Sequence, residues 1–294
     1  MSRTGRSAAS LGRFSNDRRY VERRSTTRPE FVESWRKSLR GAKPVTFQSD
    51  EEPNARIDVW VARTEELLRA RSCFSILTEA DWETVTRIRA PSSRHSAMTS
   101  RVLLRLGLSR AVDHRIAPSD WRFHVTEHGK PIVAGELPAI NFSVSHVDDF
   151  AVVAVSATLN IGVDVEGVDQ EVADGVVANF CHPDEQQSVS DLPTAQKIRE
   201  FVRFWTLKEA YTKMAGVGHS LNFNEMKFVL DPARLHSKSR TSTASDKSRF
   251  ETFYLSASHA LYHVSLAIQD FTQHKRRTEV QVISLADDEG NTVV

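Results

Sequence analysis

Hydrophobic and polar residues begin to alternate near Ile57, and ordered structure is predicted to start there. Apolar residues at positions 57, 59 and 61 are separated by Asp58 and Trp60, a period of two that is typical of a half-buried strand. The preceding residues 1–55 open with eight arginines in the first 28 positions and contain few large apolar side chains. Such a segment cannot build a core, so we predict a disordered Arg/Ser-rich tail. The same composition also fits an organelle transit peptide.

Two helices are predicted after the first strand. Thr78 is a suitable N-cap because an acidic residue follows three positions later, and Pro91 ends this helix. A longer helix is expected from about Ser92 to Ser109. Its apolar face is formed by Val102, Leu103 and Leu106. A neighbouring stripe is basic, since residues seven and four apart share a helix face: Arg94, Arg101 and Arg105.

The rest of the chain mixes strands and helices. Strands are expected at 121–125, 140–144, 150–155 and 161–166, helices at about 171–180 and 195–215, and two closing strands within 252–268. The polar stretch 235–249 is predicted to be a flexible surface insertion. This order indicates an α+β protein with two lobes of similar size. We place the N-terminal lobe at 56–158, the C-terminal lobe at 159–270 and a polar C-terminal tail at 271–294.

Composition supports a globular protein and excludes several classes. The chain has 294 residues, 40% hydrophobic and 26% charged, and its formal net charge of +1 does not point to any particular partner. Its two cysteines, Cys73 and Cys181, are too few for a disulfide framework and favour a reducing, cytoplasmic setting. No apolar run approaches the roughly 20 residues of a membrane span. Nucleic acid is not expected as a substrate, although the arginine-rich start would also suit a nucleic-acid-binding arm.

The segment from Ile161 to Glu166 carries the most specific chemistry. Side chains alternate along a strand, so Gly162, Asp164 and Glu166 lie on one face. Two neighbouring carboxylates repel each other unless a cation lies between them, and carboxylate oxygens are the ligands that Mg²⁺ prefers. A magnesium site is therefore one interpretation. An amphipathic strand with a solvated acidic face is the other.

Two further segments carry candidate polar groups. In the predicted helix around Trp205, Glu209 and Lys213 are four residues apart and share a face, as a catalytic pair or as an ordinary surface ion pair. Ser145 and His146 directly follow a predicted strand, and both can donate hydrogen bonds to a phosphate there. Ser145 as a hydrolase nucleophile is a further possibility, but no Gly-x-Ser-x-Gly elbow surrounds it.

Together these motifs resemble the surfactin-type phosphopantetheinyl transferase family. The matching pieces, in the family's order, are Gly129 to Pro131, Phe142 to His146, Gly162 to Glu166 and Trp205 to Lys213. The segment Phe180 to Glu185 also resembles the family's aromatic–x–x–x–x–acid element. The resemblance covers roughly residues 57 to 270, and four short motifs at the family's separations form a specific signal. The chain departs from the family at Ser143, where Asn is usual, and at Val147, where a small polar residue is usual.

The resemblance implies a monomer of two pseudo-symmetric α+β lobes with coenzyme A in the cleft between them. Its reaction would transfer phosphopantetheine from coenzyme A to a serine of an apo acyl or peptidyl carrier protein. The implied Mg²⁺ ligands are Asp164, Glu166 and Glu209. Glu209 would also deprotonate the carrier serine, directly or through water, and Lys213 would stabilise or protonate the leaving adenosine bisphosphate. The implied coenzyme A contacts are Lys130, Ser145, His146, Lys208, and Arg94 or its neighbour Arg101 for the 3′-phosphate.

Two alternatives from other classes remain open. The carboxylates alone would also suit another Mg²⁺-dependent phosphoryl-transfer enzyme, such as a nuclease or phosphatase. A carrier-binding module without activity would keep the fold and lose the chemistry. Consumption of coenzyme A that depends on an apo carrier protein separates the first alternative from the transferase, and binding of coenzyme A with Mg²⁺ separates the second.

Overall fold

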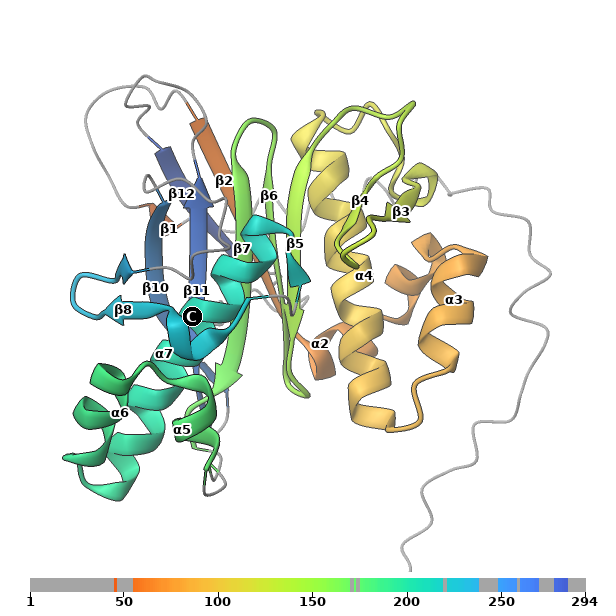
Figure 1. The fold of residues 1–294 in the computed structure, drawn as a ribbon. Helices are drawn as coiled ribbons and strands as arrows, with labels where there is room; N and C mark the ends of the chain where they lie inside the picture. Colours follow the sequence, from red (N-terminus) through yellow and green to blue (C-terminus); the bar gives the residue numbers. More distant parts are fainter. Residues whose placement is uncertain are drawn as a thin grey trace, which may run out of the picture.

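A computed structural model describes residues 45–46, 55–169, 172, 175–218, 221–237, 248–257, 260–269 and 278–284 (Figure 1). The predicted disordered tail, residues 1–55, lies outside the described residues apart from the pair 45–46 and Ala55. Within the described ranges, helices and strands mix as an α+β protein requires. No described helix combines the length and apolar character that crossing a membrane demands.

The N-terminal lobe is built on a five-stranded sheet in the order β1-β12-β2-β6-β5. Its strands are β1 (Val45–Thr46), β12 (Thr278–Ser284), β2 (Ala55–Arg63), β6 (Phe150–Ser156) and β5 (Asn141–His146). β12 runs parallel to β2, and the other neighbours are antiparallel. The helical elements of this lobe are α2 (Thr64–Arg69), η2 (Arg71–Ile76), α3 (Glu79–Thr86), α4 (Pro91–Ala111) and η3 (Pro118–Asp120), and a hairpin joins β3 (Phe123–Val125) to β4 (Pro131–Val133).

The C-terminal lobe is built on a three-stranded antiparallel sheet in the order β10-β11-β7. Its strands are β7 (Asn160–Gly167), β10 (Ser248–Ala257) and β11 (Ala260–Gln269). The long helix α7 (Thr194–Ala215) packs on β7 and β11, and it lies in front of them in Figure 1. The smaller elements are α5 (Val176–Phe180), α6 (Pro183–Ser190), η5 (Phe223–Glu225), β8 (Lys227–Val229) and β9 (Arg234–Ser237).

The two lobes repeat one topology, which confirms the predicted pseudo-symmetry. In each lobe a strand is followed by a long helix and two further strands: β2, α4, β5, β6 and then β7, α7, β10, β11. In each, the first strand pairs with the third and the third pairs with the second, always antiparallel. The two lobes therefore share both the order of these elements along the chain and the order in which their strands pair.

The core has apolar layers between the sheets and beneath each long helix. Alternate residues of β7, including Ile161, Val163 and Val165, pack against Val59 and Val152 of the N-terminal sheet. α4 covers the opposite face of that sheet, and α7 covers the opposite face of the C-terminal sheet. Because side chains alternate along β7, the positions between these apolar residues face α7. The acidic residues of β7 are thereby directed toward a helix and not toward the sheet-to-sheet core.

Two segments differ from the prediction. Residues 271–294 were expected to form a polar tail, but Thr278–Ser284 forms β12, whose Val280, Val282 and Ile283 are buried. The chain thus returns from the C-terminal lobe to the sheet of the N-terminal lobe. In the expected insertion 235–249, residues 235–237 belong to β9 and 248–249 to β10, while 238–247 lie outside the described residues.

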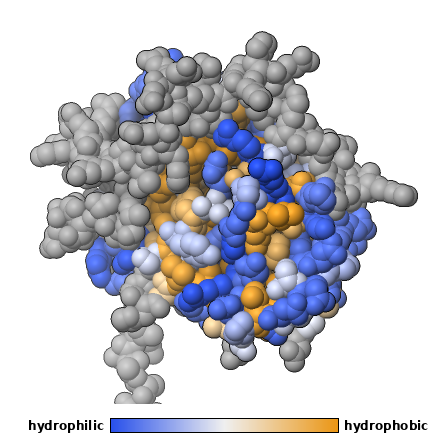
Figure 2. Space-filling model, turned by 90° about the vertical axis from the view of Figure 1, so that its left-hand side faces the viewer, coloured by the Kyte–Doolittle hydropathy of each residue, from blue (hydrophilic) through white to orange (hydrophobic). Residues whose placement is uncertain are grey.

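The surface of the C-terminal lobe mixes polar and apolar side chains. Seen from that side, apolar patches are separated by polar residues (Figure 2). Two large apolar side chains of this lobe, Val229 on β8 and Tyr254 on β10, keep 44% and 46% of their surface exposed. Scattered exposed apolar residues of this kind are normal on a globular protein.

Candidate active site at the β7–α7 contact

Gly162 determines how closely α7 approaches β7. A Cβ atom at this position would lie 2.0 Å from the carbonyl oxygen of Ala210 and 2.4 Å from the backbone nitrogen of Met214. No residue other than glycine fits such an approach of strand and helix backbones. The absent side chain therefore lets the face of α7 that carries Glu209 and Lys213 rest directly on the acidic face of β7.

Asp164 lies at the centre of the polar contacts between β7, α7 and β5. The residue is 4% exposed, and its Oδ1 accepts hydrogen bonds from Ser145 Oγ at 2.8 Å and from Lys213 Nζ at 2.6 Å. Its Oδ2 is buried and has no hydrogen-bond partner. A buried oxygen without a partner is costly, so this atom is suited to accept a hydrogen bond or to bind a cation.

Glu166 and Glu209 complete the acidic face. Glu166 is half-buried, and burial together with the charge of Asp164 raises the pKa of its carboxyl group to about 7; Lys213 and a hydrogen bond from Trp205 oppose the rise, and Glu209 adds to it. The charges of Asp164 and Glu209 thus both act on the carboxyl group of Glu166. Burial is the largest cause of the raised pKa of Glu166, and the neighbouring acids add to it.

Serine side chains of β5 join the two sheets beside the acids. The backbone N–H of Val163 donates to Ser143 Oγ at 2.9 Å, and the N–H of Val165 donates to Ser145 Oγ at 3.4 Å. These N–H groups belong to the edge of β7 that is not paired with β11. The hydroxyl groups satisfy that edge and hold β5 next to the acidic face.

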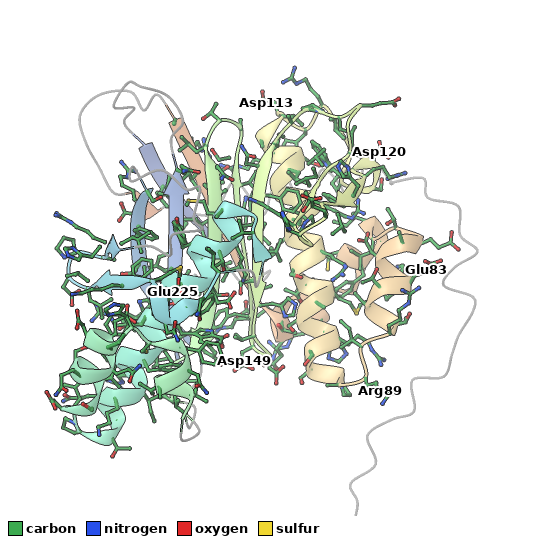
Figure 3. The ribbon with its side chains drawn as sticks, viewed as in Figure 1. Glu83, Arg89, Asp113, Asp120, Asp149 and Glu225 are labelled. Carbon is green, nitrogen blue, oxygen red and sulfur yellow. The ribbon has the colours of Figure 1, made fainter. Side chains whose placement is uncertain are left out.

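Positive charge gathers at the end of β5, between α4 and α7. His146 is exposed at the strand end, and its Nδ1 lies 3.2 Å from Ser96 Oγ on α4. Partial desolvation, then the charges of Lys213 and Arg101, lower the pKa of His146, while Asp148 opposes the shift. Groups from both long helices therefore act on one imidazole. Asp149, which follows Asp148, lies between the helices of the two lobes in Figure 3 and accepts a hydrogen bond from the hydroxyl group of Tyr262.

The two candidate arginines of α4 have partners inside their own lobe. Arg94 donates from Nε and Nη2 to the carbonyl oxygen of Ile88, at 2.9 and 2.6 Å. Arg101 donates to the carbonyl of Ala97 at 3.0 Å and lies 3.8 Å from Asp81. Desolvation lowers the pKa of Arg101, and Asp81 opposes that change. Both side chains remain partly exposed, so each retains donors for an anion.

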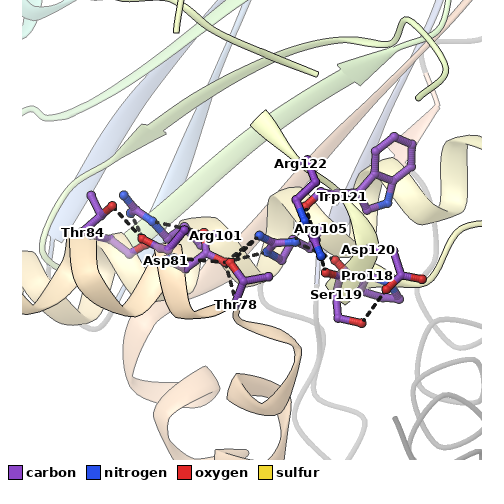
Figure 4. A network of polar contacts seen from close by, with 12 residues as sticks. Thr78, Asp81, Thr84, Arg101, Arg105, Pro118, Ser119, Asp120, Trp121 and Arg122 are labelled. Atoms are coloured by element: carbon purple, nitrogen blue, oxygen red, sulfur yellow. Dashed lines mark hydrogen bonds and ion pairs between the residues drawn. The ribbon is translucent and has the colours of Figure 1, made fainter. Parts of the chain in front are cut away.

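Arg105, the third residue of the basic stripe, is a structural residue. It is 2% exposed, and it binds Asp81 as well as the carbonyl oxygens of Pro118 and Trp121 (Figure 4). Asp81 also accepts the backbone N–H and the hydroxyl of Thr78, which forms the capping box predicted for this helix. The network fastens α3 to α4.

Lys130 reaches across to the C-terminal lobe. Its Nζ donates to the carbonyl oxygen of Met214 at 3.1 Å and to Asn160 Oδ1 at 3.2 Å. Met214 lies in the last turn of α7, where free carbonyl groups attract a cation. Desolvation lowers the pKa of Lys130. In this structure the lysine links the β3–β4 turn to α7.

The structure does not support the predicted contact of Lys208 with coenzyme A. The residue is 0% exposed, and its Nζ donates to the carbonyl oxygens of Phe180 and Phe223, each at 2.9 Å, and to Glu185 Oε2 at 2.5 Å. An ammonium group has three N–H donors, and all three are used. Lys208 is therefore an internal anchor of α7, although it is adjacent to Glu209 in the sequence.

Glu185, which the sequence analysis named only as the acid of the aromatic–x–x–x–x–acid element and not as a site residue, is the partner that determines this role. It is 2% exposed, caps α6 by accepting the N–H of His182 at 2.8 Å, and accepts the N–H of Phe228 at 2.7 Å. The signal was present in the aromatic–x–x–x–x–acid element and in Pro183 at the helix start. Its pairing with a lysine 23 residues away is a tertiary contact that no local pattern shows.

The donor set at β7 suits a hard divalent cation, but it is not arranged as a complete site. Within the described part of the chain, no three His, Cys, Asp or Glu side chains are grouped closely enough to hold a metal ion. The unpartnered Oδ2 of Asp164 and the mutual effect of the acids on Glu166 nevertheless fit a cation with oxygen ligands. Lys213 supplies the positive charge that contacts Asp164 in this structure.

Two family models match consecutive parts of the chain. Residues 160–267 match a model described as "4'-phosphopantetheinyl transferase superfamily", and residues 58–158 match "4'-phosphopantetheinyl transferase, N-terminal". A "Phosphopantetheinyl transferase" of Thraustochytrium sp. is 29% identical over 61% of this chain and 67% of its own length. The "4'-phosphopantetheinyl transferase HetI" of Nostoc sp. is 30% identical over 50% of this chain and 62% of its own.

Similarity extends to an animal protein and, more weakly, to a solved structure. The "L-aminoadipate-semialdehyde dehydrogenase-phosphopantetheinyl transferase" of Homo sapiens is 26% identical over 59% of this chain. The chain spans 58% of that relative's length. A crystal structure of Thermotoga maritima holo-[acyl-carrier-protein] synthase superposes on this chain with a TM-score of 0.31 and 16% sequence identity. The match covers 38% of this chain and 64% of the other.

Proposed function

The chain belongs to the 4′-phosphopantetheinyl transferase superfamily, and from this premise we propose that it transfers the 4′-phosphopantetheine moiety of coenzyme A to a serine of an apo acyl or peptidyl carrier protein. The observation that supports the proposal is the ion pair of Asp164 with Lys213, together with the charges of Asp164, Lys213 and Glu209 that act on Glu166. It brings acids of a strand and a lysine of a helix to one point, as phosphoryl transfer requires. A surfactin-type specificity within the superfamily is part of the same proposal.

The reaction forms one bond to phosphorus and breaks another. The carrier serine Oγ attacks the phosphorus that bears pantetheine, and the P–O bond to the adenosine-bearing phosphate breaks. The serine proton passes to the Glu209 carboxylate, directly or through a bound water molecule. Lys213 then offsets the charge of the leaving adenosine 3′,5′-bisphosphate or donates a proton to it. One turn of α7 separates the base from the lysine, so a rigid helix sets the distance between them.

Asp164, Glu166 and Glu209 are the side chains that would hold Mg²⁺. When bound, the ion supplies charge neutralisation to the pyrophosphate. Asp164 contributes a buried carboxylate with a free oxygen, and its orientation is held by Ser145. Since Ser145 already donates its proton to Asp164, we assign this serine to positioning the carboxylate and not to binding phosphate.

The remaining basic residues suit the nucleotide part of coenzyme A. His146, Arg94 and Arg101 lie at the end of β5 and along α4, where each keeps exposed surface. Lys130 would bind a phosphate only after leaving its contacts with α7. The monomeric state and the cytoplasmic location expected from the sequence stay predictions, as do the lobe boundaries.

Mass spectrometry of carrier proteins tests the proposal. The full-length protein is incubated with coenzyme A, Mg²⁺ and several apo carrier proteins, and one serine of a carrier is expected to gain the phosphopantetheine mass. Asp164→Ala and Glu209→Gln are expected to abolish the gain while the far-ultraviolet circular dichroism spectrum is retained. Lys197→Met, on α7 but far from the acids, serves as the control with normal transfer. Transfer by Asp164→Ala at the wild-type rate would contradict the assignment of the site.

A further inference from the structure

Lys213 contacts the acid that the proposed function assigns to a metal ion. Its Nζ lies 2.6 Å from Asp164 Oδ1 and reaches there from α7 with 30% of the side chain exposed. The partner carboxylate is 5% exposed. The ion pair therefore combines an anchored, buried anion with a cation on a flexible, partly solvated stem, and of the two groups the lysine is the one that can move away.

Asp164 carries a single negative charge, so one cation at a time can dominate its electrostatic interactions. Oδ1 already accepts from Ser145 and Lys213, whereas the buried Oδ2 has no partner. A divalent ion that binds this carboxylate would place two like-charged groups on one small, partly desolvated anion. Like charges this close repel strongly, so binding of the ion weakens the hold on the ammonium group.

We propose that Lys213 is an internal counter-ion of Asp164 that a divalent metal ion must displace, so that metal binding releases the lysine amine toward the phosphates. The inference rests on the proposed function and adds a role for Lys213 before the reaction begins. In the metal-free protein the lysine keeps the buried acid paired. After exchange, its amine becomes free at the time when a leaving phosphate needs a cation. The catalytic amine and the metal ion are thereby coupled through one carboxylate.

Calorimetric titration of metal-free, full-length protein with MgCl₂, without coenzyme A, measures the competition. Lys213→Met removes the competing charge and is expected to bind Mg²⁺ about tenfold more tightly than the wild type, because a charge-assisted hydrogen bond is worth about 1.5 kcal/mol or more. Lys213→Arg keeps the charge and is expected to remain within about threefold of the wild type. Lys197→Met makes the same charge change about 24 Å away along α7 and is expected to leave the affinity unchanged.

Displacement itself has a separate readout. Modification of lysines by an amine-reactive reagent, quantified by peptide mass spectrometry, is expected to become faster at Lys213 when Mg²⁺ is added and to stay constant at Lys197. Equal or weaker Mg²⁺ binding by Lys213→Met, or an unchanged modification rate at Lys213, would overturn the inference. Absence of Mg²⁺ binding in every variant would overturn it too, while phosphopantetheine transfer in the carrier assay would still support the proposed function.

Discussion

Replacing Glu166 by Gln removes the least compensated charge of the acidic face while keeping the size of the side chain. Burial and the charge of Asp164 raise the pKa of Glu166 from 4.5 to about 7, against the opposing effect of Lys213 and Trp205. The folded protein therefore holds a proton at this position that the unfolded chain releases above pH 4.5. The ionised Glu166 destabilises the metal-free fold, and Gln avoids that cost.

The size and sign of the effect follow from this pKa. Each pKa unit corresponds to about 1.4 kcal/mol, so ionisation of Glu166 costs the folded state about 3 kcal/mol. Because the folded state binds the extra proton, the free energy of unfolding of the wild type decreases as pH rises from about 4.5 to about 7. The variant lacks this decrease. The advantage of Glu166→Gln is therefore near zero at pH 4.5 and reaches about 3 kcal/mol by pH 8.

Urea denaturation in the presence of a chelator, at a series of pH values, measures this difference. The difference in unfolding free energy between the variant and the wild type cancels the contributions of the other titrating groups, because both proteins contain them. Added Mg²⁺ is expected to remove the advantage of the variant, because the ion stabilises a protein that retains its carboxylates. A variant that is less stable than the wild type at pH 8 without metal, or a difference that does not change with pH, would refute the account of an uncompensated acidic face.

Three other changes test neighbouring parts of the structure. Lys208→Met leaves Glu185 as an unpaired buried charge and is expected to lower the free energy of unfolding by about 3–5 kcal/mol in urea denaturation. Adding Glu185→Gln is expected to recover part of this loss. An unchanged stability with a raised KM for coenzyme A would instead support Lys208 as a ligand of coenzyme A. Gly162→Ala forces a methyl group against the backbone of Ala210, so it is expected to lower the free energy of unfolding by at least about 1–3 kcal/mol and to abolish carrier modification. A variant with full activity and unchanged stability would contradict the close packing of α7 on β7. Burial lowers the pKa of His263 to about 4, so the unfolded chain binds a proton before the folded protein does as pH falls below 6.5. The free energy of unfolding of the wild type is expected to fall by up to about 3 kcal/mol between pH 6.5 and 4 relative to that of His263→Gln. Unfolding free energies of the two proteins that change in parallel with pH would reject this.

Local patterns predicted the acidic face because its geometry is local. The period of two along β7 sets Asp164 and Glu166 on one side, and the four-residue spacing on α7 sets Glu209 and Lys213 on another. What brings the two faces together is Gly162, whose importance is evident only once the helix lies against it. Sequence spacing therefore predicted which side chains share a strand face or a helix face, but not the contact that brings Asp164 and Lys213 together.

Long-range partners explain where prediction failed. The helix pattern around Lys208 shows that it lies beside Glu209 in the sequence, but not that Glu185 and two carbonyl groups enclose it. Likewise, β12 is a short strand with polar residues between its apolar ones, and it is stabilised by pairing with β2, more than 200 residues earlier. Whether such a strand forms depends on the edge that β2 offers and not on the strand itself.

The repeated topology also shows why the acidic centre belongs to one lobe. In the N-terminal lobe the strand beneath the long helix carries Trp60, and the helix carries the glycine: a Cβ at Gly107 would lie 3.0 Å from Trp60 Nε1. The indole fills the space that Gly162 leaves to the backbone of α7 in the other lobe. On the same strand, Asp58 has arginines at both oxygens, Arg56 at 2.6 Å and Arg110 at 3.7 Å, whereas Asp164 keeps one oxygen without a partner. The repeated topology thus pairs both oxygens of its carboxylate with guanidinium groups in one lobe and leaves one oxygen without a partner in the other.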